Sequence, residues 1–366
     1  MKILLSSILS ILCFCFTVHT QAVYVDSNLG NDKNPGTKEA PVVSIKRAAE
    51  IIHNRDNGIY IMKINPGIYI LDSHISIATE KPMTDKRIII EAAVLPDDTS
   101  WSPEKMPVVT CKAMKGEIPD KFHWVVSFLV DESHVTLRGI KFTGYFHPNS
   151  RYYPIARLNK TKTDLSVEQC LFTGETEGSP IQVGVIAHGD EIKIDHCIFY
   201  KVRNTVVYFE PSVENGIKTG NSLTNSIIYG ANQAVWTSYP DENFTFKNNI
   251  VSNCRYVWVK SDINPTKYTI ENCVIVNNKY YTGVPDNAPV PLTPEKKFQL
   301  RLRPRKFEID EKNVTKKDQI SLRLTDSDDL ALLFGIDGPL PKDYMHVLPG
   351  TLGFDIGAGL FKYRNK

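Results

Sequence analysis

A six-residue motif, here called the phrase, occurs six times in this chain, and its spacing constrains the fold more than any other feature. The phrase has apolar residues at both ends, polar residues inside and a small residue or Asn near its middle, as in Ile194-Asp-His-Cys-Ile-Phe199. Its copies begin at residues 137, 167, 194, 223, 246 and 270, so they are 23 to 30 residues apart. A period in that range is typical of a solenoid, whose turns bury their apolar faces against one another.

Each of the first five copies of the phrase is followed, after a short turn, by a second run rich in β-branched residues. These second runs span residues 155–158, 185–188, 206–209, 234–237 and 257–260. No long helical stretch separates successive runs, which disfavours a leucine-rich horseshoe or a βαβ fold. The third place of several phrases is Asn (Asn225, Asn248, Asn272), which tolerates a left-handed backbone at tight corners. We therefore expect stacked β-coils whose corner amides form ladders.

Residues 1–22 have the pattern of a secretory signal peptide. Lys2 supplies a positive charge, residues 3–18 are mainly apolar, and cleavage is expected near Ala22, before Val23. A membrane anchor is the alternative, but the apolar stretch is short and no stop-transfer pattern follows it. The sequence predicts a secreted or periplasmic protein whose mature chain has no membrane span.

The mature chain, residues 23–366, is expected to form a single domain. Ser44 is a candidate N-cap for an amphipathic helix over residues 44–53, which would cover the N-terminal end of the solenoid. Regular coils are expected between about residues 135 and 278. A proline-rich stretch follows, and residues 283–366 are expected to fold back as a C-terminal cap.

Charge and cysteine content exclude some classes of function. The formal net charge is +2, which argues against a general nucleic-acid-binding protein because such proteins carry a strong basic excess. Five cysteines remain after the leader, at positions 111, 170, 197, 254 and 273, and no C-x-x-C pair suggests zinc. We expect these thiols to pack as small buried hydrophobes in a monomeric protein.

Three segments outside the repeats carry a family resemblance. They are Tyr24-Val-Asp-Ser-Asn-Leu-Gly30 with the helix after it, Asn65-Pro-Gly-Ile-Tyr69 and Gly353-Phe-Asp-Ile-Gly-Ala358. Together with the repeats they resemble the secreted right-handed parallel β-helix proteins of the pectate-lyase-like superfamily. The resemblance implies an all-β, right-handed parallel β-helix with an N-terminal capping helix and a C-terminal cap. It leaves activity open, because this fold hosts lyases, hydrolases, epimerases and proteins without catalysis.

The resemblance also implies a coil of three sheets, with a polysaccharide bound along the outside of one of them. We assign the second runs to that sheet, and alternation along a strand then predicts which side chains point outward. The expected outward residues are Arg157, His188, Tyr208, Glu210, Trp236, Trp258 and Lys260. The expected inward residues are Ala156, Ala187, Val207, Val235, Val257 and Val259. Aromatic rings fit sugar faces, and Arg or Lys fits uronate carboxylates, so the expected ligand is an acidic polysaccharide.

A lyase acting on uronates needs a base for the proton at C5 and a group that neutralises the carboxylate. The resemblance implies Lys or Arg as the base and Ca²⁺ as the neutralising group. The matching candidates are Lys260 and Arg255, with Glu210 as a further catalytic residue and Asp241 and Asp262 as calcium ligands. The loop from Asp26 to Asp32 also carries oxygen donors, for which a hydrogen-bonded turn is the favoured interpretation.

Two other functions remain open at this point. A glycoside hydrolase would need two carboxyl groups across the scissile bond, for which Glu210 with Asp190 or Asp241 is the available pair. A non-catalytic glycan-binding or structural protein of the same fold would need neither a base nor a metal. The spacing of residues does not choose among these functions, nor does it identify the polymer.

Overall fold

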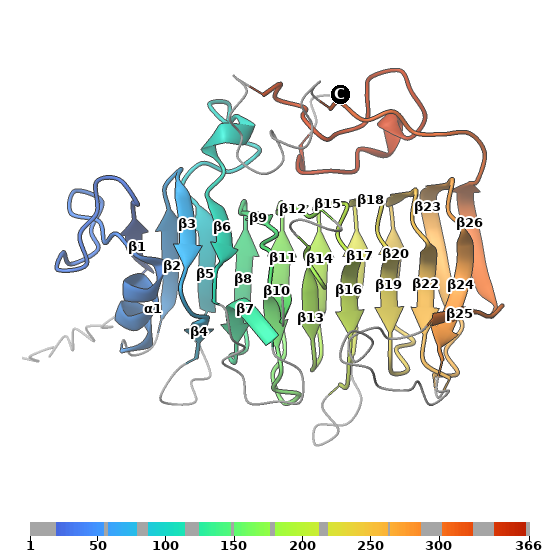
Figure 1. The fold of residues 1–366 in the computed structure, drawn as a ribbon, viewed down its shortest axis with the longest axis horizontal. Helices are drawn as coiled ribbons and strands as arrows, with labels where there is room; N and C mark the ends of the chain where they lie inside the picture. Colours follow the sequence, from blue (N-terminus) through green and yellow to red (C-terminus); the bar gives the residue numbers. More distant parts are fainter. Residues whose placement is uncertain are drawn as a thin grey trace, which may run out of the picture.

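The computed structural model describes residues 20–54, 58–78, 87–113, 124–147, 150–175, 180–211, 219–262, 264–286, 302–324 and 340–363. Within these ranges the chain is a right-handed parallel β-helix, which confirms the predicted fold class (Figure 1). The signal-peptide pattern lies almost entirely outside the described residues. No helix in the described ranges has the length and apolar character needed to cross a lipid bilayer.

Each coil contributes strands to three walls, and the strands of successive coils stack side by side in each wall. Two of the walls belong to one sheet of 17 strands. The first wall contains β1 (Thr20–Val25), β2 (Ile59–Ile64), β5 (Arg87–Ala92), β8 (Val135–Arg138), β11 (Leu165–Glu168), β14 (Ile192–Asp195), β17 (Ser222–Thr224), β20 (Thr245–Lys247), the first half of β23 (Tyr268–Val276) and β26 (Ile309–Thr315). The second wall contains β3 (Ile68–Leu71), β6 (Val108–Cys111), β9 (Lys141–Thr143), β12 (Leu171–Thr173), β15 (Ile198–Tyr200), β18 (Ile227–Tyr229), β21 (Ile250–Ser252) and the second half of β23.

The third wall is a separate sheet of nine strands. It contains β4 (Ile75–Ile77), β7 (Trp124–Val130), β10 (Arg151–Arg157), β13 (Val185–Ala187), β16 (Asn204–Tyr208), β19 (Gln233–Thr237), β22 (Tyr256–Lys260), β24 (Tyr280–Pro285) and the antiparallel β25 (Leu302–Pro304). The second runs of the sequence therefore pair with one another in this wall, as we expected.

The repeated phrase forms the corner between the first and second walls. Its apolar ends point into the coil, where Phe142, Phe172 and Phe199 stack with ring centroids 5.0 and 4.5 Å apart. Each such ring pair contributes about 0.5–1.5 kcal/mol beyond the area that it buries. The third residue of the phrase has a left-handed backbone, with φ of 50° at Asn225 and 56° at Asn248. This conformation is why Asn recurs there.

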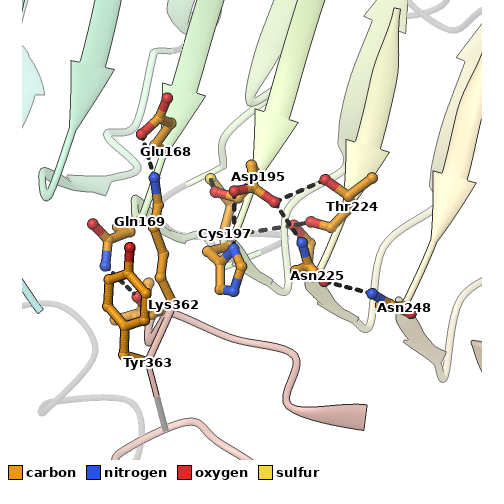
Figure 2. A network of polar contacts seen from close by, with 12 residues as sticks. Glu168, Gln169, Asp195, Cys197, Thr224, Asn225, Asn248, Lys362 and Tyr363 are labelled. Carbon is orange, nitrogen blue, oxygen red and sulfur yellow. Dashed lines mark hydrogen bonds and ion pairs between the residues drawn. The ribbon is translucent and has the colours of Figure 1, made fainter. Parts of the chain in front are cut away.

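The corner asparagines form the predicted amide ladder (Figure 2). The Nδ2 atom of each donates to the Oδ1 atom of the preceding one, over 2.8 Å from Asn248 to Asn225 and 2.7 Å from Asn272 to Asn248. Asn313 adds a further rung, and the ladder ends where Asn225 donates to the Asp195 carboxylate over 2.7 Å. Burial alone would raise the pKa of Asp195, but hydrogen bonds from His196, Asn225 and Thr224 outweigh it and lower the pKa to about 2.

The N-terminal end is covered by a helix, as the sequence predicts. Helix α1 (Ile45–His53) begins after Ser44, whose hydroxyl accepts a hydrogen bond from the Arg47 amide over 3.0 Å. Ile45, Ala48 and Ile52 are buried in the same core cluster as the first strands. Figure 1 shows α1 beside β1 and β2 at this end of the molecule.

Residues 340–363, here called the C-terminal strap, run back along the outside of the second wall (Figure 1). The strap contains the short 3₁₀ helix η2 (Phe354–Ile356), while η1 (Pro103–Lys105) lies in an earlier loop. It packs on the outward apolar residues of five coils, which are Leu171, Ile198, Ile227, Ile250 and Val274. Gln169 donates to the Leu360 carbonyl over 2.7 Å, and Lys362 pairs with Glu168 at 2.6 Å (Figure 2).

The coil continues beyond residue 278, where we expected the regular part to end. β24 adds a strand to the third wall, and β26 pairs in parallel with β23 in the first wall. β26 differs from the earlier strands because its residues Asp310, Glu311 and Lys312 are exposed. Charged side chains on an edge strand oppose further strand pairing, so β26 is suited to ending the sheet.

Candidate functional site

The register of the third wall separates two tryptophans that we expected on one face. Trp236 lies opposite Val259, whereas Trp258 lies opposite Val235 in the interior. The outward position of Trp258 was therefore a wrong prediction, because Trp258 is one position out of register with Trp236 and side chains alternate between faces. Trp258 is 0% exposed, and its Nε1 donates to Thr237 over 3.0 Å. The rings around it belong to Phe244, Phe246 and Tyr268.

Tyr208 is also on the inner face, contrary to our expectation. It lies opposite Ala187 and Thr237, belongs to the interior core cluster and donates its hydroxyl proton to the Ser222 carbonyl over 2.8 Å. Burial raises the pKa of Tyr208 well above its ordinary value. Val207, expected inside, instead joins the apolar cluster on the outer face. The alternation predicted for this strand is thus shifted by one residue.

Arg157 is buried rather than available to a ligand, which corrects a third expected binding residue. It is 0% exposed, and its Nε and Nη2 atoms donate to the carbonyls of His188 over 2.7 Å and of Asp190 over 2.9 Å. Burial lowers the pKa of Arg157 to about 10, an effect opposed by the nearby Asp190 and Asp164, so the guanidinium remains charged at neutral pH. Arg157 therefore positions the turn that follows β13.

Lys260 and Arg255 lie at opposite ends of β22 and cannot act on the same sugar. The five residue steps between them correspond to about 16 Å of extended chain. Lys260 donates to the Thr266 carbonyl over 3.2 Å and lies 4.6 Å from the Phe307 ring centre. Burial and the neighbouring Arg305 lower the pKa of Lys260.

Neither proposed calcium ligand has a donor set that fits a calcium site. Asp241 is 3% exposed and accepts hydrogen bonds from four neighbouring groups. These donors are the Thr219 hydroxyl and the amides of Gly220, Asn221 and Asn243. Asp262 pairs with Arg305 and lies 3.7 Å from Arg303, so two cations already neutralise it. In the described residues no three carboxylate, His or Cys side chains converge as a metal site would require.

The loop after β1 is a hydrogen-bonded turn, as we favoured. Asp26 accepts from the amides of Asn28 and Leu29, each over 2.9 Å, and from the Asn65 side chain over 2.8 Å. Burial acts to raise the pKa of Asp26, but these hydrogen bonds lower it overall. The Asp32 carboxylate is occupied in the same way by the amide and hydroxyl of Ser44.

Four polar or charged residues do converge, at the carboxyl ends of successive third-wall strands. We call this group the outer site and define it as Lys160, His188, Glu210 and Tyr239. The Tyr239 hydroxyl donates to Glu210 Oε1 over 3.0 Å, and Lys160 Nζ lies 3.9 Å from Glu210 Oε2. The side chains of Lys160 and Glu210 are 47% and 40% exposed, so a ligand can reach them.

Aromatic rings border the outer site on the third wall. The His188 ring stacks on Phe209 with centroids 4.8 Å apart, and the Phe209 and Trp236 centroids are 6.1 Å apart. All three side chains are half-buried. The Trp236 indole N–H has no hydrogen-bond partner in the described chain. An apolar platform therefore lies beside the charged groups.

The backbone fixes His188 and Glu210 relative to each other. The amide of Gly189, which has a φ of 88°, donates to the Glu210 carbonyl over 2.7 Å. A Cβ at Gly189 would lie 2.1 Å from the Lys162 carbonyl oxygen, so this position requires glycine. Because Arg157 holds the carbonyls on both sides of Gly189, one buried cation and one glycine set the turn that carries the site.

Electrostatics give the members of the outer site different proton affinities. Burial lowers the pKa of His188; Glu210 opposes this change, whereas Arg157 and Lys160 add to it. The hydrogen bond to Glu210 is the main cause that raises the pKa of Tyr239. At neutral pH the site therefore holds a neutral imidazole, which can accept a proton, and a phenol, which can donate one.

His188 and Glu210 were predicted from the sequence, whereas Tyr239 and Lys160 were not. The pairing of Tyr208 with Thr237 places Glu210 and Tyr239, each two residues later, at equivalent positions of neighbouring coils. The correct alignment of these two runs would therefore have indicated Tyr239. Lys160 lies in a turn with no repeated pattern, and no sequence signal marks it.

No protein-family model and no curated protein sequence matches this chain. Among solved structures, a rhamnogalacturonan lyase is similar to it, with a TM-score of 0.44 and 14% sequence identity. The similarity covers 72% of this chain and 70% of the lyase. It assigns no substrate, activity or functional residue to this chain.

Proposed function

We propose that this protein cleaves an acidic polysaccharide by β-elimination at the outer site. The observation that carries the proposal is the 3.0 Å hydrogen bond between Tyr239 and Glu210 next to the half-buried His188. A proton acceptor and a proton donor thus lie together at the carboxyl edge of a long parallel sheet, beside the exposed side chains of Lys160 and Glu210. Such a pair is what the cleavage of a uronate by elimination requires.

In the proposed reaction, neutral His188 removes the proton at C5 of a uronate. The electron pair of the C5–H bond forms the C4–C5 double bond, and the bond between C4 and the glycosidic oxygen breaks. Tyr239 supplies the proton that this leaving oxygen takes up, and Glu210 orients the phenol through their hydrogen bond. The products are one chain with an unsaturated uronate end and one with a free hydroxyl.

The other neighbours of the site have binding roles in this proposal. The Lys160 ammonium pairs with the uronate carboxylate, which stabilises the charge that develops when C5 loses its proton. Phe209 and Trp236 provide the apolar surface on which a sugar ring packs. Lys260 and Arg255 have no catalytic part, since neither lies at the outer site.

The test is to incubate the protein with a panel of uronate polymers and record the ultraviolet absorbance of the unsaturated product. We expect His188→Ala, Tyr239→Phe and Glu210→Gln each to lower kcat by about 100-fold or more. Trp236→Ala should mainly raise KM, by about tenfold. Lys247→Ala, on the first wall and away from the outer site, is the matched control and should leave both constants unchanged.

A non-catalytic glycan-binding protein is the alternative that this experiment separates. It predicts that no unsaturated product forms on any polymer, while Trp236→Ala still weakens binding. A hydrolase is less favoured, because both carboxylates proposed to accompany Glu210 are buried, Asp190 at 4% and Asp241 at 3% exposure. A carboxyl group in that state cannot activate water across a sugar ring.

We also propose that the chain is exported and acts as a monomer. Cleavage near Ala22 would leave Val23 and Val25 of β1, which pair with Met62 and Ile64 of β2. The first wall would therefore keep its first strand after processing. Sequencing the N-terminus of the mature protein should place it near Val23, and sedimentation should give the mass of one chain.

A further inference from the structure

Two exposed cations lie side by side where the third-wall strands begin, at the edge opposite the outer site. Arg255 precedes β22 and Lys279 precedes β24, and these strands pair in parallel with Tyr256 opposite Tyr280. Arg255 and Lys279 are therefore neighbours on adjacent coils, about 5 Å apart along the axis. Both are exposed. Figure 1 shows β22 and β24 next to each other near the C-terminal end of the helix.

Each of these cations is held over an aromatic ring. Arg255 lies 5.5 Å from the Tyr256 ring centre and Lys279 lies 5.5 Å from that of Tyr280. The two tyrosine rings pack against each other with centroids 5.0 Å apart. The Tyr256 hydroxyl also donates to the Leu302 carbonyl over 3.1 Å, which fixes its ring. Both charges are thus pre-oriented on a rigid base.

The same line of positions contains a third cation two coils earlier. The Asn232 amide donates to the Arg203 carbonyl over 2.7 Å, and the Tyr280 amide donates to the Arg255 carbonyl over 2.8 Å. Arg203, Asn232, Arg255 and Lys279 therefore occupy equivalent places on four successive coils. We call Arg203, Arg255 and Lys279 the cation row, which extends for about 14 Å along the axis.

Charge balance distinguishes Arg255 and Lys279 from other basic residues on the surface. Arg305 pairs with Asp262, and Lys247 pairs with Glu271 at 2.6 Å. In the parts of the chain that the structure describes, no carboxylate forms a salt bridge with Arg255 or Lys279. Like charges on neighbouring strands repel each other, so an anionic partner at the row would stabilise it.

We propose that the cation row is a second binding surface for an acidic polysaccharide, separate from the outer site. Its cations are spaced at one or two coil repeats, so it fits a linear polymer whose carboxylates or sulfates recur along its length. The choice of polysaccharide rests on the proposed function, whereas the row itself does not. The row would hold a long polymer on the protein without taking part in the reaction.

Two features of the row favour a glycan over other polyanions. The tyrosine faces beneath Arg255 and Lys279 are occupied by the cations, so they offer no platform for stacking nucleic-acid bases. The formal net charge of +2 provides little of the long-range attraction on which nucleic-acid binding depends. Recognition of an anionic membrane typically uses clusters of about four to eight Lys or Arg, and the row has three cations.

The experiment measures binding of the full chain to polygalacturonate, alginate and heparin, with single-stranded RNA and phosphatidylserine vesicles as competing polyanions and dextran as the neutral control. Glu210→Gln is used as the background, so that cleavage does not interfere. We expect Arg255→Ala with Lys279→Ala to weaken binding of at least one acidic polymer about tenfold and to reduce its salt dependence. The control pair Lys247→Ala with Lys267→Ala removes the same charge from the first wall and should change binding less than twofold.

Failure of this inference and failure of the proposed function give different results. Equal binding by the cation-row variant and its background would overturn the inference even if the protein forms unsaturated product. Equal losses in the cation-row and control variants would also overturn it, since only net charge would then matter. Tighter binding to single-stranded RNA or to anionic vesicles than to every acidic polymer would overturn the assigned partner. Row-dependent binding without any product would support the row and contradict the lyase.

Discussion

Two corners of the coil use their side chains in opposite ways. At the corner after the first wall, neighbouring coils repeat one residue, and Asn225, Asn248 and Asn272 bond to one another. At the outer site, after the third wall, neighbouring coils present different residues, among them His188 and Glu210. Where neighbouring coils repeat a residue, its side chains hydrogen-bond to one another. Where neighbouring coils carry different residues, polar side chains remain available to a ligand. In this fold, repeated positions therefore maintain the coil, and non-repeated positions are where chemistry is to be sought.

The largest expected effect is the difference in stability between tryptophan substitutions on the two faces of the third wall. Trp258→Ala should destabilise the protein by about 3–5 kcal/mol, because it empties a fully buried site in the core. Trp236→Ala on the outer face should cost less than about 1 kcal/mol. Urea unfolding of the two variants checks this difference. Equal losses of stability would contradict the register of β19 and β22.

The next effect concerns the buried cation that supports the outer site. Arg157→Met should cost about 2–3 kcal/mol, because the carbonyls of His188 and Asp190 lose their donor. The His188 pKa should rise toward its ordinary value, since Arg157 is one of the charges that lower it. NMR titration of His188 measures this change apart from activity. An unchanged titration would show that Arg157 acts on the backbone alone.

Breaking the amide ladder should have a smaller effect. Asn248→Ala removes the bonds to Asn225 and Asn272 and puts alanine at a φ of 56°, which together should cost about 1–2 kcal/mol. Asn248→Gly relieves the backbone but not the lost bonds, so it should recover part of the stability. Thermal unfolding of both variants separates the two causes. No difference between them would contradict the strain contribution.

The smallest effect is the pH dependence of the stability that Asp195, at the end of the ladder, contributes to the fold. The folded-state pKa of Asp195 is about 2, below its ordinary value of 3.8, so its carboxylate stabilises the fold above that ordinary value. This contribution is lost as pH falls from about 4 through 2, and we expect about 1 kcal/mol because Asp195 is partly exposed. Urea unfolding between these pH values should show a flatter slope in Asp195→Asn than in the native chain.

The fold was predictable from the sequence because each coil repeats the same local chemistry. The Asn at the third place of the phrase reflects a backbone requirement, and Ser44 reflects the unbonded amides of a helix start. Such signals are local and do not depend on which coil carries them. The ladder and the capping helix were therefore both predicted with nearly the right residues.

The orientation of single side chains in the third wall was not predictable in the same way. A strand of five residues alternates every second position, and Asn204 at the start of β16 lies opposite Gln233 in β19, so no repeated residue marks the alignment of these two strands. Aligning Tyr208 with Trp236 instead of Thr237 is an error of one residue, and it exchanges inside for outside. Tyr239 was missed for the same reason, because it becomes the neighbour of Glu210 only in the true register.

The amide ladder has a direction, and this bears on how such a chain can grow by duplication of coils. The Asp195 carboxylate can only accept hydrogen bonds, so the ladder stops there. One coil earlier, the side-chain amide of Gln169 donates instead to the Asp97 carboxylate and to the carbonyl of Leu360 in the C-terminal strap (Figure 2). Asn313, at the other end, donates to Asn272, and its own oxygen accepts no hydrogen bond from the described residues, so it can receive a further rung. A coil copied between Asp195 and Asn313 would extend the series unchanged. A coil copied before Asp195 would instead displace the tether at Gln169, so the two halves of the molecule differ in how readily evolution can lengthen them.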